Sequence, residues 1–152
     1  MWLLSSAFEE NQTIDRRFTA DGLDESPPLT IHDVPKAAKS LVLCMSDPDA
    51  PRGTWIHWVR VDIPPTTTKL AAAQPRTVFP GDGSCQLRND FGWVGYGGPA
   101  PPRGQTHRYE FKLVALDRVL NVDPKVSCQA VSQLMTGCIL ATATLTAIYG
   151  RV

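Results

Sequence analysis

The chain has 152 residues, of which 43% are hydrophobic and 20% are charged, a composition typical of one folded domain rather than of a disordered chain. Its 15 basic and 15 acidic side chains cancel and no basic stripe stands out, so we expect one domain over residues 1–152 and no nucleic-acid partner. No apolar run approaches the roughly 18 residues of a membrane span, and no basic segment precedes the apolar start, so we expect neither a transmembrane segment nor a signal peptide.

Proline is the unusual residue of this chain. Twelve of the 13 prolines lie between Pro27 and Pro102, and proline interrupts both helices and central strands. This distribution excludes a helical bundle and predicts short strands joined by shaped loops.

Hydrophobic patterns predict strands over residues 2–8, 29–31, 40–46, 55–63, 107–116 and 138–149. The run 40–46 is continuously apolar, which is typical of a strand buried on both faces. Residues 75–104 hold seven of the 11 glycines together with several aromatic residues. We therefore expect a long irregular loop that packs on itself and on the core.

A short helix is predicted late in the chain. Asp123 and Pro124 have the composition of a helix start, and Gly137 that of a helix stop. The threonine-rich segment that follows favours a strand. Together these elements predict a mainly β protein, an antiparallel β-sandwich of two sheets with one or two short helices late in the chain.

The four cysteines are widely and irregularly spaced, at Cys44, Cys85, Cys128 and Cys138. The absence of a CxxC pair argues against a zinc site built from cysteines. We expect reduced thiols in a cytoplasmic protein, with a secreted disulfide scaffold as the alternative. Cys44 lies in the apolar run 40–46 and is expected to act as a small buried hydrophobe.

Two predicted strands begin with a histidine on one face, because side chains i and i+2 of a strand point the same way. One face of 55–63 carries Trp55, His57, Val59 and Val61, and one face of 107–116 carries His107, Tyr109, Phe111 and Leu113. Both faces are apolar further along, so we expect both histidines to point inward. The other face of 107–116, which includes Arg108, is expected to face solvent. Two hydrogen-bonded core histidines without a ligand are the alternative interpretation.

Two stiff loops accompany these histidines. In Asp47-Pro48-Asp49-Ala50-Pro51 the two prolines fix the backbone and hold both carboxylates in place. An Asx turn that caps a strand end would give the same pattern. The second loop, over residues 97–104, is rich in glycine and proline and leads into His107. Its free N–H groups could form an anion-binding nest.

These motifs resemble the phosphatidylethanolamine-binding protein family, which includes the Raf kinase inhibitor proteins. The sequence DPDAP, followed at this spacing by His107-Arg108-Tyr109, is highly specific for that family. The resemblance extends along nearly the whole chain, and segments 24–29, 89–92, 95–99 and 137–151 are similar to its small prokaryotic members.

The resemblance implies a sandwich with a small pocket at one edge that accepts phosphate, acetate or a phospholipid headgroup. Carried over residue by residue, the ligand-binding positions are Asp47, Trp55, His57, Gly98, Pro101, His107 and Tyr109. The positions that support the pocket are Pro48, Asp49, Pro51 and Arg108. No cofactor and no metal are expected.

The chain departs from its small relatives at two positions. Cys138 stands where they often have histidine, and Ala100 where they often have cysteine; neither change touches the proposed pocket. Longer eukaryotic members carry a C-terminal helix at the pocket mouth, and we expect this chain, which ends at Val152, to lack it.

The expected function is binding of a small anion, namely phosphate, acetate or a phosphoethanolamine-like group, or of a phosphorylated partner. Resemblance to the family adds a kinase or a protease as a protein partner and modulation of kinase signalling. One alternative is a hydrolase or metal-dependent enzyme that uses the His/Asp pocket; another is a kinase or protease inhibitor that acts through its surface. We expect no enzymatic activity, because Ser84 lacks a GxSxG elbow.

Overall fold

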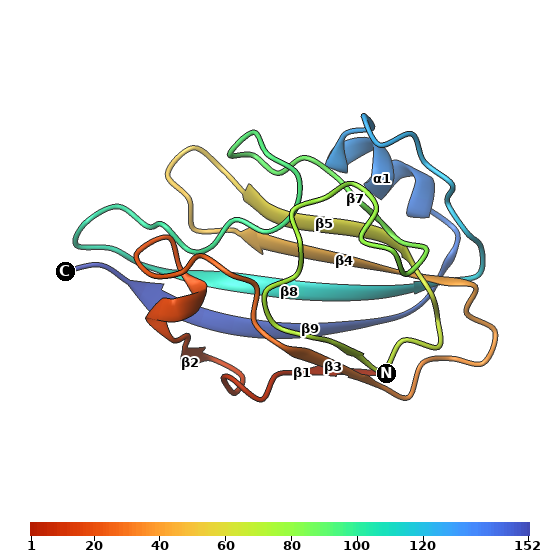
Figure 1. The fold of residues 1–152 in the computed structure, drawn as a ribbon, viewed down its shortest axis with the longest axis horizontal. Helices are drawn as coiled ribbons and strands as arrows, with labels where there is room; N and C mark the ends of the chain where they lie inside the picture. The colour runs from red at the N-terminus through yellow and green to blue at the C-terminus, as the bar shows by residue number, and fades with distance from the viewer.

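The computed structural model describes every residue from 1 to 152. Its strands form two sheets (Figure 1), as the sequence predicts. The smaller sheet has the order β1-β3-β6, with bounds Trp2–Leu4, Leu29–His32 and Lys69–Leu70. The larger has the order β2-β9-β8-β4-β5-β7, with bounds Gln12–Thr13, Ile139–Gly150, Thr106–Leu116, Ser40–Asp47, Trp55–Ile63 and Cys85–Gln86. Neighbouring strands are antiparallel, except that β2 runs parallel to β9.

The main core of 20 buried residues lies between the two sheets. From β8 it includes Tyr109, Phe111 and Leu113, and His107 is buried at the start of the same face. The opposite face of β8 exposes Arg108 and half-buries Glu110. The inward alternation predicted for this strand is therefore confirmed.

A second apolar cluster covers the outer face of the larger sheet. It has nine buried residues, and the single α-helix, α1 (Cys128–Met135), contributes Val131 to it. Val42 of β4 belongs to this outer cluster, whereas Leu41 and Leu43 belong to the main core. Both faces of the first half of β4 are thus buried, as its continuous apolar run predicts, whereas Cys44 and Ser46 on the outer face are partly exposed.

The predicted face of β5 is wrong beyond His57, because the strand contains a bulge. Met45 pairs with Trp58 but Ser46 pairs with Ile56, so His57 is an extra residue on β5. Trp58 therefore turns into the main core, while Val59 and Val61 turn to the outer cluster. A strict alternation cannot anticipate this change of face.

The predicted helix start is also wrong. The Asp123 carboxylate accepts a hydrogen bond from the Lys125 N–H and closes a local turn. The helix begins only at Cys128, where the Ser127 hydroxyl accepts from the Ala130 N–H. Gly137 follows the end of the helix with a φ of 78°, as a helix stop should.

Several further segments differ from the expectation. The short strands β2, β6 and β7 were not predicted, and β7 lies within the loop 75–104 that was expected to be irregular. The first strand ends at Leu4 rather than at residue 8. A 3-10 helix, η1 (Arg16–Phe18), was not foreseen, and Asp15 caps it by accepting from the Arg17 N–H. The long loop 75–104 packs on the core as predicted: its Tyr96 is buried and donates a hydrogen bond to the Phe18 carbonyl.

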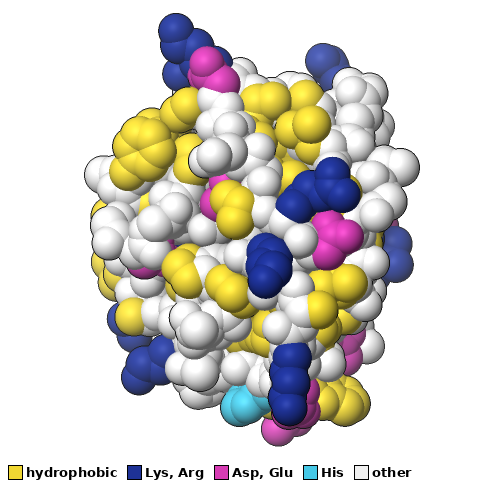
Figure 2. All heavy atoms as spheres, turned by 90° about the vertical axis from the view of Figure 1, so that its right-hand side faces the viewer, with side chains coloured by type: hydrophobic (Ala, Val, Ile, Leu, Met, Phe, Trp, Pro, Cys, Tyr) yellow, Lys and Arg dark blue, Asp and Glu magenta, His cyan; other side chains and the backbone are white.

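The candidate site residues meet at one end of the sandwich. In Figure 1, β4 ends and β5 and β8 begin at the left-hand end, where the chain also terminates. Figure 2 looks at the right-hand end, whose surface intersperses basic, acidic and hydrophobic side chains. No helix of the structure has the length and apolar character that crossing a bilayer requires.

Candidate functional site

A cavity of about 210 Å³ lies where β4 ends and β5 and β8 begin. Its walls combine polar side chains with prolines and aromatic rings: Asp47, Ala50, Pro51, Trp55, His57, Phe91, Ala100, Pro101, Pro102 and His107. Five of the seven predicted ligand residues are in this set. Gly98 and Tyr109 lie outside it.

Asp47 and His107 form a buried pair in the cavity wall. The His107 Nδ1 lies 2.7 Å from the Asp47 carboxylate, and its Nε2 lies 2.7 Å from the Gln105 side-chain oxygen. The other Asp47 oxygen accepts from the Asp49 N–H at 2.8 Å, so the motif also forms the Asx turn considered above. The orientation of the His107 ring is therefore fixed from both sides.

His57 is anchored differently and keeps one ring nitrogen free of protein partners. Its Nδ1 donates to the Gly97 carbonyl at 2.6 Å, and the Gly97 N–H donates to the His57 carbonyl at 2.9 Å. Burial lowers the pKa of His57, although the Gly97 carbonyl and the Asp47 carboxylate favour the charged form. The ring is thus neutral at pH 7, with a proton on Nδ1 and a lone pair on Nε2.

Aromatic rings surround both histidines. Tyr109 lies beneath the cavity, 5.3 Å from the His57 ring and 6.5 Å from the His107 ring between centroids. Phe91 contacts His57 edge-on at 5.1 Å and also contacts Trp55. Phe91 was not predicted as a site residue; its only signal was its place in the segment 89–92 that resembles the family.

The Tyr109 hydroxyl is buried and makes no well-formed hydrogen bond, although the Ala100 backbone lies near it. Burial raises the pKa of this phenol, and the nearby Asp47 carboxylate raises it further. Tyr109 is therefore a neutral side chain that supports the two imidazoles from below and does not line the cavity.

Ion pairs hold the two loops that carry the cavity walls. Asp49 accepts three hydrogen bonds from Arg108, through the backbone N–H and the guanidinium. Arg108 lowers the pKa of Asp49 to about 2. On the other loop, the Arg151 guanidinium donates to the Pro101 carbonyl at 3.0 Å and pairs with Asp21.

Gly98 lies against the segment that contains Phe18 and Asp24. Its N–H donates to the Asp24 carboxylate at 2.7 Å. A Cβ at this position would lie 2.5 Å from the Phe18 carbonyl oxygen, so only glycine allows this approach. Of the predicted support residues, Pro51 lines the cavity and Pro48 does not.

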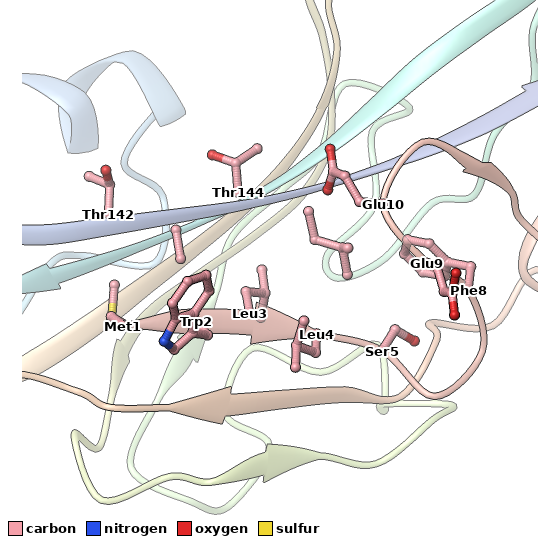
Figure 3. A pocket seen from close by; sticks show the side chains of 12 residues that line it. Met1, Trp2, Leu3, Leu4, Ser5, Phe8, Glu9, Glu10, Thr142 and Thr144 are labelled. Carbon is pink, nitrogen blue, oxygen red and sulfur yellow. The ribbon is translucent and has the colours of Figure 1, made fainter.

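A larger hollow of about 550 Å³ lies elsewhere, between β1 and β9. Figure 3 shows the side chains of β1 on one side and Thr142 and Thr144 of β9 on the other. It contains no histidine, and its acidic side chains, Glu9 and Glu10, would repel an anion. Nowhere do three or more side chains of the metal-ligating types form a cluster. Of these two hollows, only the smaller one contains histidines.

Comparison with known proteins agrees with this geometry. The profile of the family described as "Phosphatidylethanolamine-binding protein" matches residues 4–150. A UPF0098 protein of Methanothermobacter thermautotrophicus is 46% identical over 151 residues and covers 99% of both chains. The crystal structure of a putative phosphatidylethanolamine-binding protein homologue from Chlamydia trachomatis has a TM-score of 0.90 at 36% identity, covering 99% of this chain and 97% of that one.

A second solved structure gives the same result. Escherichia coli YbcL, a member of the mammalian PEBP family, has a TM-score of 0.91 at 33% identity and covers 99% of this chain and 98% of its own. The family profile spans every strand after β1, the histidine pair and both loops of the site. The chain belongs to the phosphatidylethanolamine-binding protein family.

Proposed function

We propose that the cavity binds a small anion that carries a phosphate or carboxylate group, such as a phospholipid headgroup. The observation that carries the proposal is the free Nε2 of His57 in a cavity whose opposite wall is the Asp47–His107 pair. Both ring nitrogens of His107 already have protein partners, and so does Nδ1 of His57.

The surroundings favour binding of a negative charge once His57 takes up a proton. A charge-assisted hydrogen bond from Nε2–H to a phosphate oxygen is stronger than a neutral one. Trp55 and Phe91 exclude water from one side of the cavity, which strengthens that interaction.

The size of the cavity supports a small ligand group. A volume of about 210 Å³ corresponds to roughly seven waters at about 30 Å³ each. A phosphate with a short substituent fits such a space, and a lipid chain would extend outside it. A partner protein with a phosphorylated side chain, such as a kinase, would present the same chemistry.

All four cysteines are free, which supports a reducing, cytoplasmic setting.

Titration with phosphoethanolamine, followed by NMR, tests the proposal. His57→Ala should weaken binding about 10- to 100-fold, because it removes the hydrogen bond from Nε2–H to the charged ligand. His107→Ala should weaken binding as well, because it leaves the buried Asp47 carboxylate in the cavity wall without its imidazole partner. His32→Ala is the matched control, since His32 is exposed at the end of β3. Unchanged affinity in both site variants would refute the proposal.

A further inference from the structure

Two of the four cysteines lie together on the outer face of the larger sheet. Cys44 belongs to β4 and Cys128 is the first residue of α1. Both are partly exposed, whereas Cys85 and Cys138 are buried. Cys44 is therefore not the fully buried hydrophobe that its apolar strand predicts.

The two thiols line one narrow cavity of about 140 Å³ beneath α1. The rest of its wall is mostly apolar and comes from β4, β5, β8, α1 and the start of β9: Val42, Val59, Lys112, Val114, Val131, Ser132, Met135 and Ile139. Both sulfurs face this space and are near enough for each thiol to shift the pKa of the other. Two partly exposed thiols in the wall of one small cavity are an arrangement that favours thiol–disulfide exchange.

The environment distinguishes the two sulfurs. The neighbouring Cys44 thiol lowers the pKa of Cys128, and Cys128 together with burial raises the pKa of Cys44. Cys128 also lies at the N-terminus of an α-helix, where N–H groups favour a thiolate. Lys112 of β8 favours charge on Cys44, and Asp90 opposes charge on both sulfurs. Cys128 is the attacking thiol and Cys44 the resolving one.

We propose that Cys44 and Cys128 are a redox-active pair that small-molecule disulfides convert into an intramolecular disulfide. The Cys128 thiolate attacks one sulfur of the small disulfide, whose S–S bond breaks and releases one thiolate. The Cys44 sulfur, losing its proton to solvent, then attacks Cys128 in the mixed disulfide and displaces the second thiolate. The two leaving groups take up the two protons, so two protein thiols are oxidised and one small disulfide is reduced.

The link would fix α1 to β4. Only Val131 of the helix is fully buried, so packing alone holds the helix weakly. The link would also join positions that are distant in sequence, which constrains the unfolded chain. The candidate anion site is on the other side of the sheet, so this proposal does not depend on the proposed function.

Oxidised glutathione added to the native protein tests the pair by mass spectrometry. The parent should lose two hydrogens, about 2 Da, and its peptide map should contain a Cys44–Cys128 link. The temperature of unfolding should rise on oxidation and return after reduction. Cys85→Ser and Cys138→Ser are the matched controls, and either variant that remains folded by circular dichroism should still form the link.

The single variants separate the two roles. Cys44→Ser should accumulate a stable glutathione adduct on Cys128, because the resolving thiol is missing. Cys128→Ser should react much more slowly. A parent protein that keeps a glutathione adduct without closing the link, or that forms only links between molecules, would overturn the proposal.

Discussion

At the residue scale, the candidate site depends on one extra residue in a strand. The bulge in β5 turns His57 toward Tyr109 and lets its Nδ1 reach the Gly97 carbonyl. The sequence predicted that His57 points inward, but from an alternation that fails two residues later. Periodicity cannot reveal a bulge, because the insertion depends on pairing with β4.

Tyr109 shows where the family resemblance and the geometry differ in detail. The resemblance places it among the ligand-binding residues, whereas the structure places it beneath the cavity with an unpartnered hydroxyl. The sequence could not distinguish a residue that lines the cavity from one that lies beneath it, because either would lie on the same inward face of β8.

Tyr109→Phe should therefore leave anion affinity unchanged. It should keep or raise the free energy of unfolding, by up to about 1 kcal/mol, because it removes a buried hydroxyl without a partner. Urea unfolding and a phosphate titration measure the two effects. A large loss of affinity in a stable variant would show that Tyr109 contacts the ligand after all.

At the element scale, long segments with a clear hydrophobic pattern were predictable. The choice between neighbouring side chains that could each cap the helix was not. The bounds of β5 coincide with the prediction, β8 differs by one residue at its start, and β9 differs by one residue at each end. The start of α1 was misplaced because Asp123 and Ser127 are both good caps, and only the fold decides which one is used. The interior of loop 75–104 was likewise beyond prediction, since its hydrogen bonds reach distant segments such as η1.

Gly98→Ala tests how the glycine–proline loop of the site is joined to the segment that contains Phe18 and Asp24. The added Cβ would collide with the Phe18 carbonyl and the Asp24 carboxylate, so unfolding free energy should fall by about 1–3 kcal/mol. Urea unfolding measures the loss, and a phosphate titration below the transition should still show binding. A variant as stable as the parent but unable to bind would mean that Gly98 contacts the ligand directly.

At the scale of the whole molecule, the site is a product of topology. Asp47 ends β4, His57 lies near the start of β5 and His107 near the start of β8, and these three strands are adjacent in the larger sheet. Antiparallel order therefore brings together residues that are up to 60 positions apart. The motifs predicted this grouping through the family resemblance, whereas composition and periodicity alone predicted the sandwich and the inward position of both histidines.

The central claim concerns the protonation of His57, which gives the pocket a pH dependence. Burial lowers the pKa of His57 in the free protein, and an anion at Nε2 favours the charged ring. Binding is then coupled to proton uptake, so affinity should rise as the pH falls toward that lowered pKa. A phosphodiester is the suitable probe, because its own charge does not change near neutral pH.

The most direct measurement is the ¹⁵N NMR spectrum of the His57 imidazole at pH 7, recorded with and without saturating phosphodiester. In the free protein it should show a neutral ring with the proton on Nδ1. With the ligand it should show protons on both nitrogens, while the signals of His32 stay unchanged. A His57 spectrum that remains neutral while the phosphodiester binds would contradict the account.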